Sequence, residues 1–338
     1  MFPLQRGRRL RTNESIRSLV RETSLSPADF MFPMFIVEGE NEISEIPSMP
    51  GIFRRSIDLT VEEVKEVFTL GIRAINIYVK VDESLKDNTG KEAWNPNGLM
   101  QQAIKAIKAA CPDMIVMPDV ALDPYSIYGH DGIIENLPAG RQGGDVANDA
   151  TNEALVKMAI SHAQAGADFI APSDMMDGRV LRLRQGLDAA GYSNVGIMSY
   201  SAKYASALYG PFRDALDSAP REMDMLVPKD KKTYQMDYAN RIEAIKEALM
   251  DVEEGADMVM VKPGIAYLDI VREVKNAVNV PVTVFHVSGE YAMIKAASER
   301  GWLDHDSIMM EQLMCIKRAG ASLISTYFAK EAAILLNR

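Results

Sequence analysis

The sequence contains 338 residues, of which 47% are hydrophobic and 25% are charged, and its formal net charge is -10. The first two fractions are typical of a globular protein, whereas the acidic balance argues against a general nucleic-acid-binding protein, which carries a basic face. No apolar stretch approaches the roughly 18–20 residues that span a bilayer. We therefore expect neither a nucleic-acid nor a membrane partner.

Residues 1–30 include several arginines but lack the apolar core of a secretory signal. This composition fits a short transit-like tail or an arm that contacts another copy of the chain, and we predict the arm. Cys111 and Cys315 stand far apart and neither belongs to a C-x-x-C motif, which predicts neither a disulfide framework nor a thiolate metal site. The expected compartment is the cytoplasm.

From residue 31 to residue 338 the pattern predicts one catalytic domain in which short apolar strands alternate with amphipathic helices. The predicted strands are Met31–Val37, Ala74–Val79, Met114–Pro118, Asp168–Ala171, Val195–Ser199, Asp257–Val261, Val282–Val287 and Ser322–Tyr327. The predicted helices include Thr60–Thr69, Leu99–Ala110, Asn152–Ala165, Ala239–Val252 and Leu268–Val278. This alternation is typical of parallel β/α units with both faces of the sheet covered.

Three helix-to-strand joints resemble one another: AGADFI at 165–170, EGADMV at 254–259 and AGASLI at 319–324. Each places glycine where a helix needs a left-handed C-cap, just before a strand. Together with the eight predicted strands, they indicate an α/β fold, an eight-stranded parallel β/α (TIM) barrel. A doubly wound open sheet is the alternative, but no G-x-G-x-x-G follows the first strand.

Two segments interrupt the alternation. Residues 136–149 are rich in glycine and polar residues and are predicted to form a surface loop. Residues 210–236 contain PFRD, SAPRE and VPKDKKTYQM. We predict that this second segment is a lid, because long loops in compact domains often cover a binding site.

Two lysines are predicted to lie at the carboxyl ends of the strands, which form the active-site face of a β/α barrel. Lys203 follows the fifth strand and Lys262 ends the sixth. A lysine amine attacks a carbonyl only when it is unprotonated, and burial or a second ammonium lowers its pKa from about 10.4. A single strand-end lysine is more commonly solvated or salt-bridged, but two at one barrel mouth favour imine formation with a carbonyl substrate.

Other polar residues near the strand ends have competing interpretations. Asp119, Asp123 and Asp131 could bind a hard cation, hold an ammonium or cap a helix, and their spacing alone favours capping. The lid carries charges that could be solvated or could clamp substrate carboxylates. These lid residues are Arg213, Lys229, Lys231 and Lys232. His286 is interpreted as a strand-face packing residue rather than as a base.

Longer motifs follow one another along nearly the whole chain: IMSYSAKYAS, YGPFRDA, KKTYQM, VMVKPG, VSGEYAMIK and IKRAGA. In this combination and order the chain resembles the 5-aminolevulinate dehydratase (porphobilinogen synthase) family. The resemblance implies that two molecules of 5-aminolevulinate condense to porphobilinogen, with loss of two waters, in tetrapyrrole biosynthesis. It also implies a homo-octamer.

The resemblance assigns roles to the strand-end and lid residues. Lys203 and Lys262 would each form an imine with one substrate molecule. Lys262 would hold the substrate that supplies the acetyl and aminomethyl side of the product, and Lys203 the one that supplies the propionyl side. The substrate carboxylates would be bound by two pairs, Arg213 with Lys231 and Ser288 with Tyr327.

Metal use differs between branches of this family. Zinc-dependent relatives carry three cysteines in the segment that corresponds to Asp119–Gly132, where this chain has Ala121, Asp123 and Asp131. Hard oxygens replace soft thiolates, so we expect no active-site zinc and assign the chain to the aspartate-rich, magnesium-stimulated branch. Asp123 and Asp131 could orient the amine of one substrate or bind a hard cation, and both alternatives stay open.

By the same resemblance, Glu247 corresponds to the direct ligand of an allosteric magnesium ion, and Asp177 to a residue that holds the ion's waters. Magnesium keeps much of its water shell, so one direct carboxylate is physically reasonable. The chain departs from the family pattern at Tyr128, where relatives often have histidine, and at Phe285–His286, where many have Tyr-Gln. Neither departure touches the lysines.

Two other functions remain open from the sequence. An imine-forming barrel aldolase needs only one lysine and would tolerate loss of Lys203. A catalytically silent barrel could act as a scaffold or ligand-binding protein, although the lysine pair and the charges of the lid argue against it.

Overall fold

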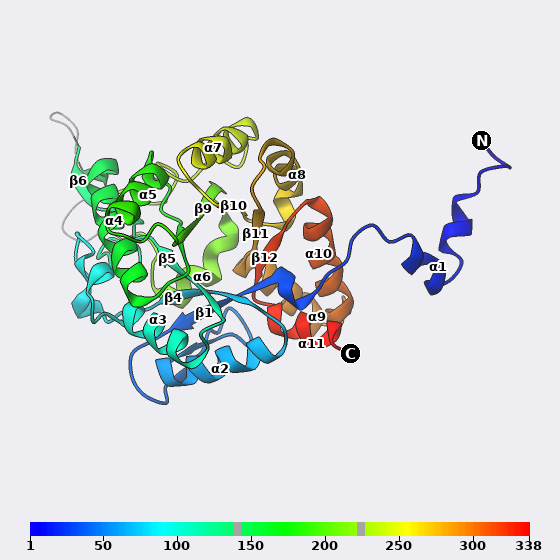
Figure 1. Ribbon diagram of the computed structural model, residues 1–338, viewed down its shortest axis with the longest axis horizontal. Helices are drawn as coiled ribbons and strands as arrows, with labels where there is room; N and C mark the ends of the chain where they lie inside the picture. Colours follow the sequence, from blue (N-terminus) through cyan, green and yellow to red (C-terminus); the bar gives the residue numbers. More distant parts are fainter. Residues whose placement is uncertain (138–142, 222–226) are drawn as a thin grey trace.

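The computed structural model describes residues 1–137, 143–221 and 227–338, and its centre is a closed barrel of eight parallel strands (Figure 1). The strands follow one another around the barrel in chain order, and the last pairs with the first at Phe30↔Ile324 and Met31↔Ser325. The barrel strands are β1 (Phe30–Ile36), β4 (Ala74–Val79), β5 (Ile115–Val120), β8 (Phe169–Pro172), β9 (Gly196–Lys203), β10 (Met258–Lys262), β11 (Val282–His286) and β12 (Leu323–Thr326). The predicted β/α barrel is confirmed.

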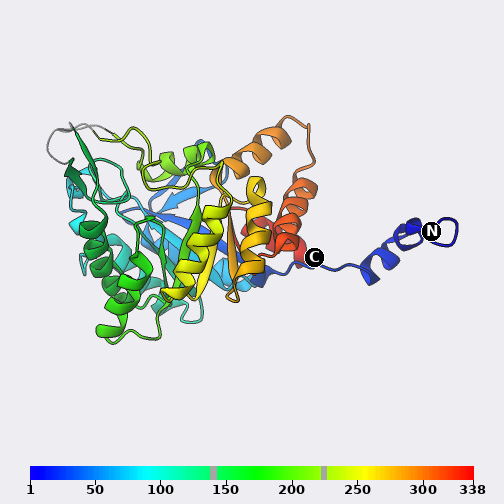
Figure 2. The same ribbon diagram turned by 90° about the horizontal axis from the view of Figure 1, so that it is seen from above.

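The longer helices lie outside the barrel and cover its strands (Figures 1 and 2). They are α2 (Ile57–Thr69), α3 (Leu99–Ala110), α4 (Asn148–Ala165), α5 (Arg179–Ala189), α7 (Ile242–Glu253), α8 (Leu268–Ala277), α9 (Ser288–Glu299), α10 (His305–Ala319) and α11 (Ala329–Leu336). None of the helices in these described ranges has the length and apolar character of a membrane span.

The apolar patterns explain why these elements form. Every residue of β4, AINIYV, is buried because one face of the strand meets the barrel interior and the other meets the helices. In α3 the buried residues Met100, Ala103, Ile104 and Ile107 recur at the spacing of one helix face. The glycines of the three helix-to-strand joints all have positive φ, namely 106° at Gly166, 108° at Gly255 and 129° at Gly320.

The first predicted interruption is partly ordered structure rather than a surface loop. Its ends form a two-stranded antiparallel hairpin of β6 (Ile134–Asn136) and β7 (Gly144–Val146), and α4 begins already at Asn148. Residues 138–142 of this interruption lie outside the described residues. The predicted surface loop is therefore wrong for the described flanks, because cross-strand pairing uses their backbone hydrogen-bonding groups.

The second interruption, the predicted lid at 210–236, begins with the short helix α6 (Gly210–Leu216). Arg54 of the short strand β3 (Phe53–Arg55) donates hydrogen bonds of 2.7 Å to the carbonyls of Ala215 and Asp214. Residues 222–226 of the lid lie outside the described residues. Between β1 and α2, β3 pairs with β2 (Ile43–Glu45) and extends the barrel sheet beyond β1.

The N-terminal residues extend away from the barrel in both views (Figures 1 and 2). This segment contains a short 3-10 helix, Gly7–Arg11, and the helix α1 (Glu14–Leu19), neither of which has a buried residue. Its assignment as an arm for oligomer contacts stays a prediction.

Candidate active site at the barrel mouth

Lys203 and Lys262 lie side by side on neighbouring strands. They are the last residues of β9 and β10, and the parallel register pairs them with each other. Their exposed fractions are only 6% and 5%. Two amines that are next to one another and removed from water destabilise each other's charged form.

An irregularity in β9 accounts for the direction of Lys203. The register of β9 against β10 shifts between Val259 and Val261, so Tyr200 and Ser201 together oppose Met260. Regular alternation would place Lys203 on the face opposite to Tyr200, whose hydroxyl meets that of Tyr78 at 2.9 Å inside the barrel. The extra residue restores Lys203 to the inner face. The sequence prediction that β9 ends at Ser199 was therefore too short.

Lys203 contacts groups from two further elements. Its Nζ lies 3.0 Å from Oδ2 of Asp131 and donates a short hydrogen bond to the carbonyl of Ser173, which follows β8. Ser173 Oγ donates in turn to Oδ1 of Asp119 at 2.7 Å. Burial, followed by the neighbouring Asp123 carboxylate, raises the pKa of Asp119 to about 7. Asp119, predicted to follow β5, lies within it.

Lys262 has aromatic rather than anionic neighbours. Its Nζ lies 4.5 Å from the ring centre of Phe285 and 4.8 Å from that of Phe212, with the rings of Tyr209 and Tyr200 at 5.1 and 5.2 Å. Such rings attract an ammonium, but burial and then the Lys203 ammonium lower the pKa of Lys262 to about 7. The neutral amine of Lys262 is thus accessible near neutral pH.

Lys231 from the lid lies between two aspartates. Its Nζ is 2.5 Å from Oδ1 of Asp131 and 3.3 Å from Oδ2 of Asp123. Burial alone would raise the pKa of Asp131, but the ammonium groups of Lys203 and Lys231 together hold it below its ordinary value. Conversely, Asp123 and Asp131 outweigh the effect of burial on Lys231 and raise its pKa. The two aspartates hold an ammonium here, and the predicted capping role is wrong.

Of the remaining predicted substrate-binding residues, Arg213 lies on the side of Lys231, whereas Ser288 and Tyr327 contact Phe212 and Phe285, two of the residues around Lys262. Arg213 on α6 is partly exposed, makes no ion pair with any carboxylate in the described ranges, and lies near enough to Lys231 to oppose its charge. Ser288 Oγ accepts from the Phe212 N–H at 3.1 Å. The Tyr327 hydroxyl is buried and has no hydrogen-bond partner among the described residues. Arg213 and Tyr327 therefore offer donors that are free for a ligand.

Glu247 and Asp177, predicted to serve a magnesium ion, line one cavity outside the barrel mouth. The cavity also includes the stretch Lys232–Asp237, directly after Lys231. Burial, followed by the Asp251 carboxylate, raises the pKa of Glu247. A cation at this position would stabilise the charged carboxylate, and acidic oxygens are the ligands that magnesium accepts. In the described part of the chain, no group of three or more His, Cys, Asp or Glu side chains is arranged to hold a metal.

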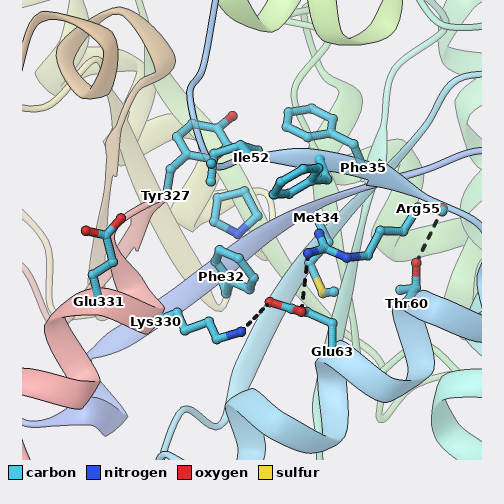
Figure 3. Close-up of a pocket in the computed structure, with 13 residues that line it drawn as sticks. Phe32, Met34, Phe35, Ile52, Arg55, Thr60, Glu63, Tyr327, Lys330 and Glu331 are labelled. Atoms are coloured by element: carbon cyan, nitrogen blue, oxygen red, sulfur yellow. Dashed lines mark hydrogen bonds and ion pairs between the residues drawn. The ribbon is translucent and has the colours of Figure 1, made fainter. Parts of the chain in front are cut away.

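A further hollow lies between β1, α2 and α11, and neither Lys203 nor Lys262 lines it (Figure 3). Its volume is about 180 Å³. Glu63 accepts from Arg55 at 3.4 Å and from Lys330 at 3.1 Å, so the charges around this hollow are already paired. Tyr327 contributes to its wall, but Figure 3 shows the tyrosine oxygen pointing away from the two ion pairs.

Several residues of the site carry no recognisable signal in the sequence. The rings around Lys262 come from β9, the short 3-10 helix Ala207–Tyr209, α6 and β11, so only the closed barrel brings them together. His130 was not singled out, although it is fully buried next to Asp131. His286 donates or accepts at both ring nitrogens, with Thr326 Oγ1 at 3.1 Å and Gln312 Oε1 at 3.0 Å, as the packing interpretation predicts.

A closed β/α barrel that buries two lysine amines side by side at the carboxyl ends of its strands defines a class, the barrel enzymes that form imines with carbonyl substrates. Comparisons with known proteins specify the family. The family model described as delta-aminolevulinic acid dehydratase matches residues 4–335. The chain belongs to the delta-aminolevulinic acid dehydratase family.

Individual relatives agree over almost their full lengths. The delta-aminolevulinic acid dehydratase of Synechococcus elongatus is 50% identical over 334 residues, covering 98% of this chain and 99% of the relative. That of Staphylococcus epidermidis is 49% identical over 333 residues, covering 98% and 99%. The crystal structure of the Toxoplasma gondii enzyme in complex with the reaction product porphobilinogen has a TM-score of 0.92 and 46% identity, covering 99% of this chain and 92% of that one.

Proposed function

We propose that this chain condenses two molecules of 5-aminolevulinate to porphobilinogen, with loss of two waters, through imines at Lys203 and Lys262. The chain is a hydro-lyase of tetrapyrrole biosynthesis, as its family membership and near-complete coverage of its relatives establish. The observation that carries the two-imine mechanism is the pairing of Lys203 with Lys262 across neighbouring strands, with both amines buried.

Lys262 is ready to attack a ketone. Because its pKa is about 7, its neutral amine is available at neutral pH, and it can add to the ketone carbon of one 5-aminolevulinate molecule. The addition gives a carbinolamine, which loses water to form the imine. The surrounding rings exclude water from this step and favour the cationic imine by the same attraction that they exert on an ammonium.

Lys203 needs a proton acceptor before it can attack. Its ammonium is held by Asp131 and by the carbonyl of Ser173, so the second substrate reacts only after a proton leaves. Asp119, whose pKa is about 7, can exchange protons near neutral pH. It accepts from the hydroxyl of Ser173, the residue whose carbonyl holds the Lys203 ammonium, so it lies close to this position without a direct hydrogen bond to the amine. A group with a pKa near the working pH is the most effective acid–base catalyst.

The two substrate carboxylates differ in their expected partners. Arg213 and Lys231 provide cationic donors on the lid side. Tyr327 provides a neutral hydroxyl donor on the side of β12 and α9, and its unpartnered hydroxyl supports this assignment. The Ser288 hydroxyl donates to the Leu208 carbonyl at 3.3 Å, so it would have to turn its hydrogen from this carbonyl to the substrate. Lysine at position 231 supplies charge without the bidentate geometry that arginine would give.

The alternative, a barrel aldolase that uses one lysine, predicts a different outcome in one experiment. The protein is incubated with 5-aminolevulinate, reduced with borohydride, and the modified residue is mapped by mass spectrometry. We expect an adduct on Lys262 and none on Lys86, a buried lysine whose Nζ lies 2.5 Å from Glu83. Lys203→Ala should abolish porphobilinogen formation. No adduct on Lys262 would refute imine catalysis, and retained turnover by Lys203→Ala would favour the single-lysine aldolase.

Metal use in the proposed function follows from ligand chemistry. At the barrel mouth, Asp123 and Asp131 already neutralise the Lys231 ammonium, and Ala121 offers no ligand atom, so these residues do not fit an active-site zinc. Glu247 and Asp177 fit a hydrated magnesium ion, for which Glu247 would be the direct ligand and Asp177 would hold waters. Bound there, magnesium would act as an allosteric activator.

We further propose a homo-octamer in the cytoplasm. Exposed apolar side chains on the N-terminal arm support self-association. Cys111 and Cys315 are both free, which fits a reducing compartment.

A further inference from the structure

His130 connects the Asp131 segment to the lid residues on both sides of Lys231. Its Nε2 lies 2.9 Å from the carbonyl of Pro228, and its Nδ1 lies 2.9 Å from the hydroxyl of Tyr234. The imidazole has no exposed surface. One side chain therefore fixes the lid at two points, three residues before and three residues after Lys231.

The hydrogen-bond pattern selects one neutral tautomer of His130. A carbonyl oxygen only accepts, so Nε2 must carry the hydrogen that faces Pro228. The Asp131 N–H donates to the Tyr234 oxygen at 3.2 Å, which leaves the tyrosine hydrogen for Nδ1 of His130. Every donor in this network then has an acceptor, whereas a second proton on the imidazole would leave the tyrosine hydrogen without one. Burial lowers the pKa of His130 and supports the neutral form.

The same lid segment is coupled to Lys231 and to Lys203. The Lys231 carbonyl accepts from the N–H groups of Tyr234 at 3.3 Å and Gln235 at 2.8 Å, so Lys231 and Tyr234 belong to one tight turn. At the end of this turn the Met236 N–H donates to the Lys203 carbonyl at 3.1 Å. A displacement of Tyr234 would therefore shift Lys231 away from Asp123 and Asp131.

We infer that His130 is a positioning residue: it holds lid residues 228–236 against the barrel so that the Lys231 ammonium stays between Asp123 and Asp131. The imidazole forms its hydrogen bonds with Pro228 and Tyr234 rather than with Lys203 or Lys262. Its effect on the reaction therefore passes through the backbone turn of residues 231–235. This inference rests on the proposed substrate-binding role of Lys231.

The test compares His130→Ala with three other variants. Tyr234→Phe removes only the hydroxyl, and His130→Gln retains a donor that can reach Pro228 while losing the acceptor for Tyr234. His162→Ala is the matched control, because His162 is also fully buried but neither of its ring nitrogens has a hydrogen-bond partner in the described part of the chain. Any general effect of emptying a buried histidine site should appear in this control.

Two measurements are made on each variant: backbone hydrogen exchange of the peptide that spans 228–236, and steady-state kinetics with 5-aminolevulinate. For His130→Ala we expect about tenfold faster exchange of this peptide and about a tenfold higher KM, which corresponds to two hydrogen bonds of modest net strength. The kcat should change far less than KM. Tyr234→Phe and His130→Gln should show smaller changes in the same direction, and His162→Ala should leave both quantities at the wild-type values.

Exchange within about twofold of wild type in His130→Ala, or equal acceleration of this peptide in His162→Ala, would overturn the inference. Faster exchange with an unchanged KM would support the positioning role of His130 and would contradict the substrate-binding role of Lys231. Failure of this inference is therefore distinguishable from failure of the proposed function, which the Lys262 adduct tests separately.

Discussion

At the scale of single residues, the two active-site lysines differ in how their charge is balanced. Lys203 faces Asp131, whereas Lys262 faces four aromatic rings and no carboxylate in the described part of the chain lies within ion-pair distance of it. An amine without an anionic partner loses its proton more readily. We infer that Lys262 forms the first stable imine.

The pKa of Lys262 gives a pH prediction with a defined sign. The ammonium is lost as pH rises through about 7, so the rate of adduct formation on Lys262 should increase from pH 6 to pH 8 and then level off. Because the Lys203 ammonium contributes to the lowered pKa, Lys203→Met should move the midpoint to higher pH. Mass-spectrometric quantification after cyanoborohydride reduction measures both midpoints. A wild-type midpoint above about pH 9 would contradict a depressed pKa.

Tyr327 provides a second residue-level prediction. Its buried hydroxyl has no partner among the described residues, so Tyr327→Phe should leave the melting temperature unchanged or higher. If the hydroxyl binds a substrate carboxylate, its loss should lower kcat/KM by roughly tenfold to a hundredfold, as expected for a hydrogen bond to a charged group of about 1.5–3 kcal/mol.

Tyr291→Phe is the control for Tyr327→Phe, because the Tyr291 hydroxyl donates to the Pro50 carbonyl at 2.6 Å. This change should lower the melting temperature and leave kcat/KM near the wild-type value. An unchanged kcat/KM in Tyr327→Phe would remove Tyr327 from the binding site.

At the scale of secondary structure, the strand and helix patterns were sufficient to predict the barrel, and the end of β10 was sufficient to locate Lys262. They also placed Lys203 after the fifth strand, but they did not predict that its side chain points inward, which depends on the extra residue in β9. Local periodicity does not report such a register shift, which is decided by pairing with β10. The cluster of Lys231 with Asp123 and Asp131 was likewise hidden, since it joins residues about a hundred positions apart in the chain.

The turn before Asp131 sets how closely lid residues 219–221 can approach the barrel. Gly129 has φ of 67°, and a Cβ added to it would lie 2.2 Å from the Ala219 carbonyl oxygen. Nearby, the Arg221 N–H donates to the Tyr128 carbonyl at 3.0 Å. Glycine is needed here for two separate reasons, the left-handed backbone and the contact between two backbone segments.

Gly129→Ala should therefore be more damaging than an alanine at a glycine with the same backbone alone. Gly301 is the matched control, with φ of 70° and nothing within 4 Å of an added Cβ. Gly301→Ala should cost about 1–2 kcal/mol of stability from the left-handed backbone, with unchanged KM. Gly129→Ala should cost more and should also raise KM by displacing the lid. Equal melting temperatures and equal KM values in the two variants would refute the close-contact argument.

At the scale of the whole molecule, the magnesium proposal connects the outside of the barrel with the lid. Glu247 on α7, lid residues 232–236 and the adjoining Asp237 line the same cavity. A cation beside Glu247 would relieve the unfavourable burial of its carboxylate and would favour the lid position that completes the cavity. Differential affinity for that position is what an allosteric activator requires.

Glu247→Ala should remove stimulation by magnesium while leaving turnover without added magnesium. Glu253→Ala, an exposed change on the same helix, is the control and should keep the response. Titration calorimetry measures magnesium binding independently of activity. A zinc-selective chelator should leave the activity of the wild type unchanged, and strict zinc dependence would contradict the interpretation of Ala121, Asp123 and Asp131.

The contacts of the N-terminal arm support the proposed assembly, because the arm does not use its polar and apolar side chains to bind the described part of its own barrel. Among the described residues, the side-chain hydrogen bonds and ion pairs of residues 1–21 stay within this segment. Its apolar side chains are exposed, including Met1 at 92%, Leu4 at 82% and Leu19 at 82%. Apolar groups left in water on an extended segment support the proposal that this segment packs against a second copy of the chain.

Deletion of residues 1–24 should therefore reduce the oligomer without unfolding the barrel. We expect the full-length chain to sediment as an octamer and the truncated chain as a smaller species, with nearly the same melting temperature at high protein concentration. A dependence of the melting temperature on concentration in the full-length chain alone would show that assembly contributes to stability. An octamer that persists after the deletion would show that contacts between barrels, rather than the arm, hold the subunits together.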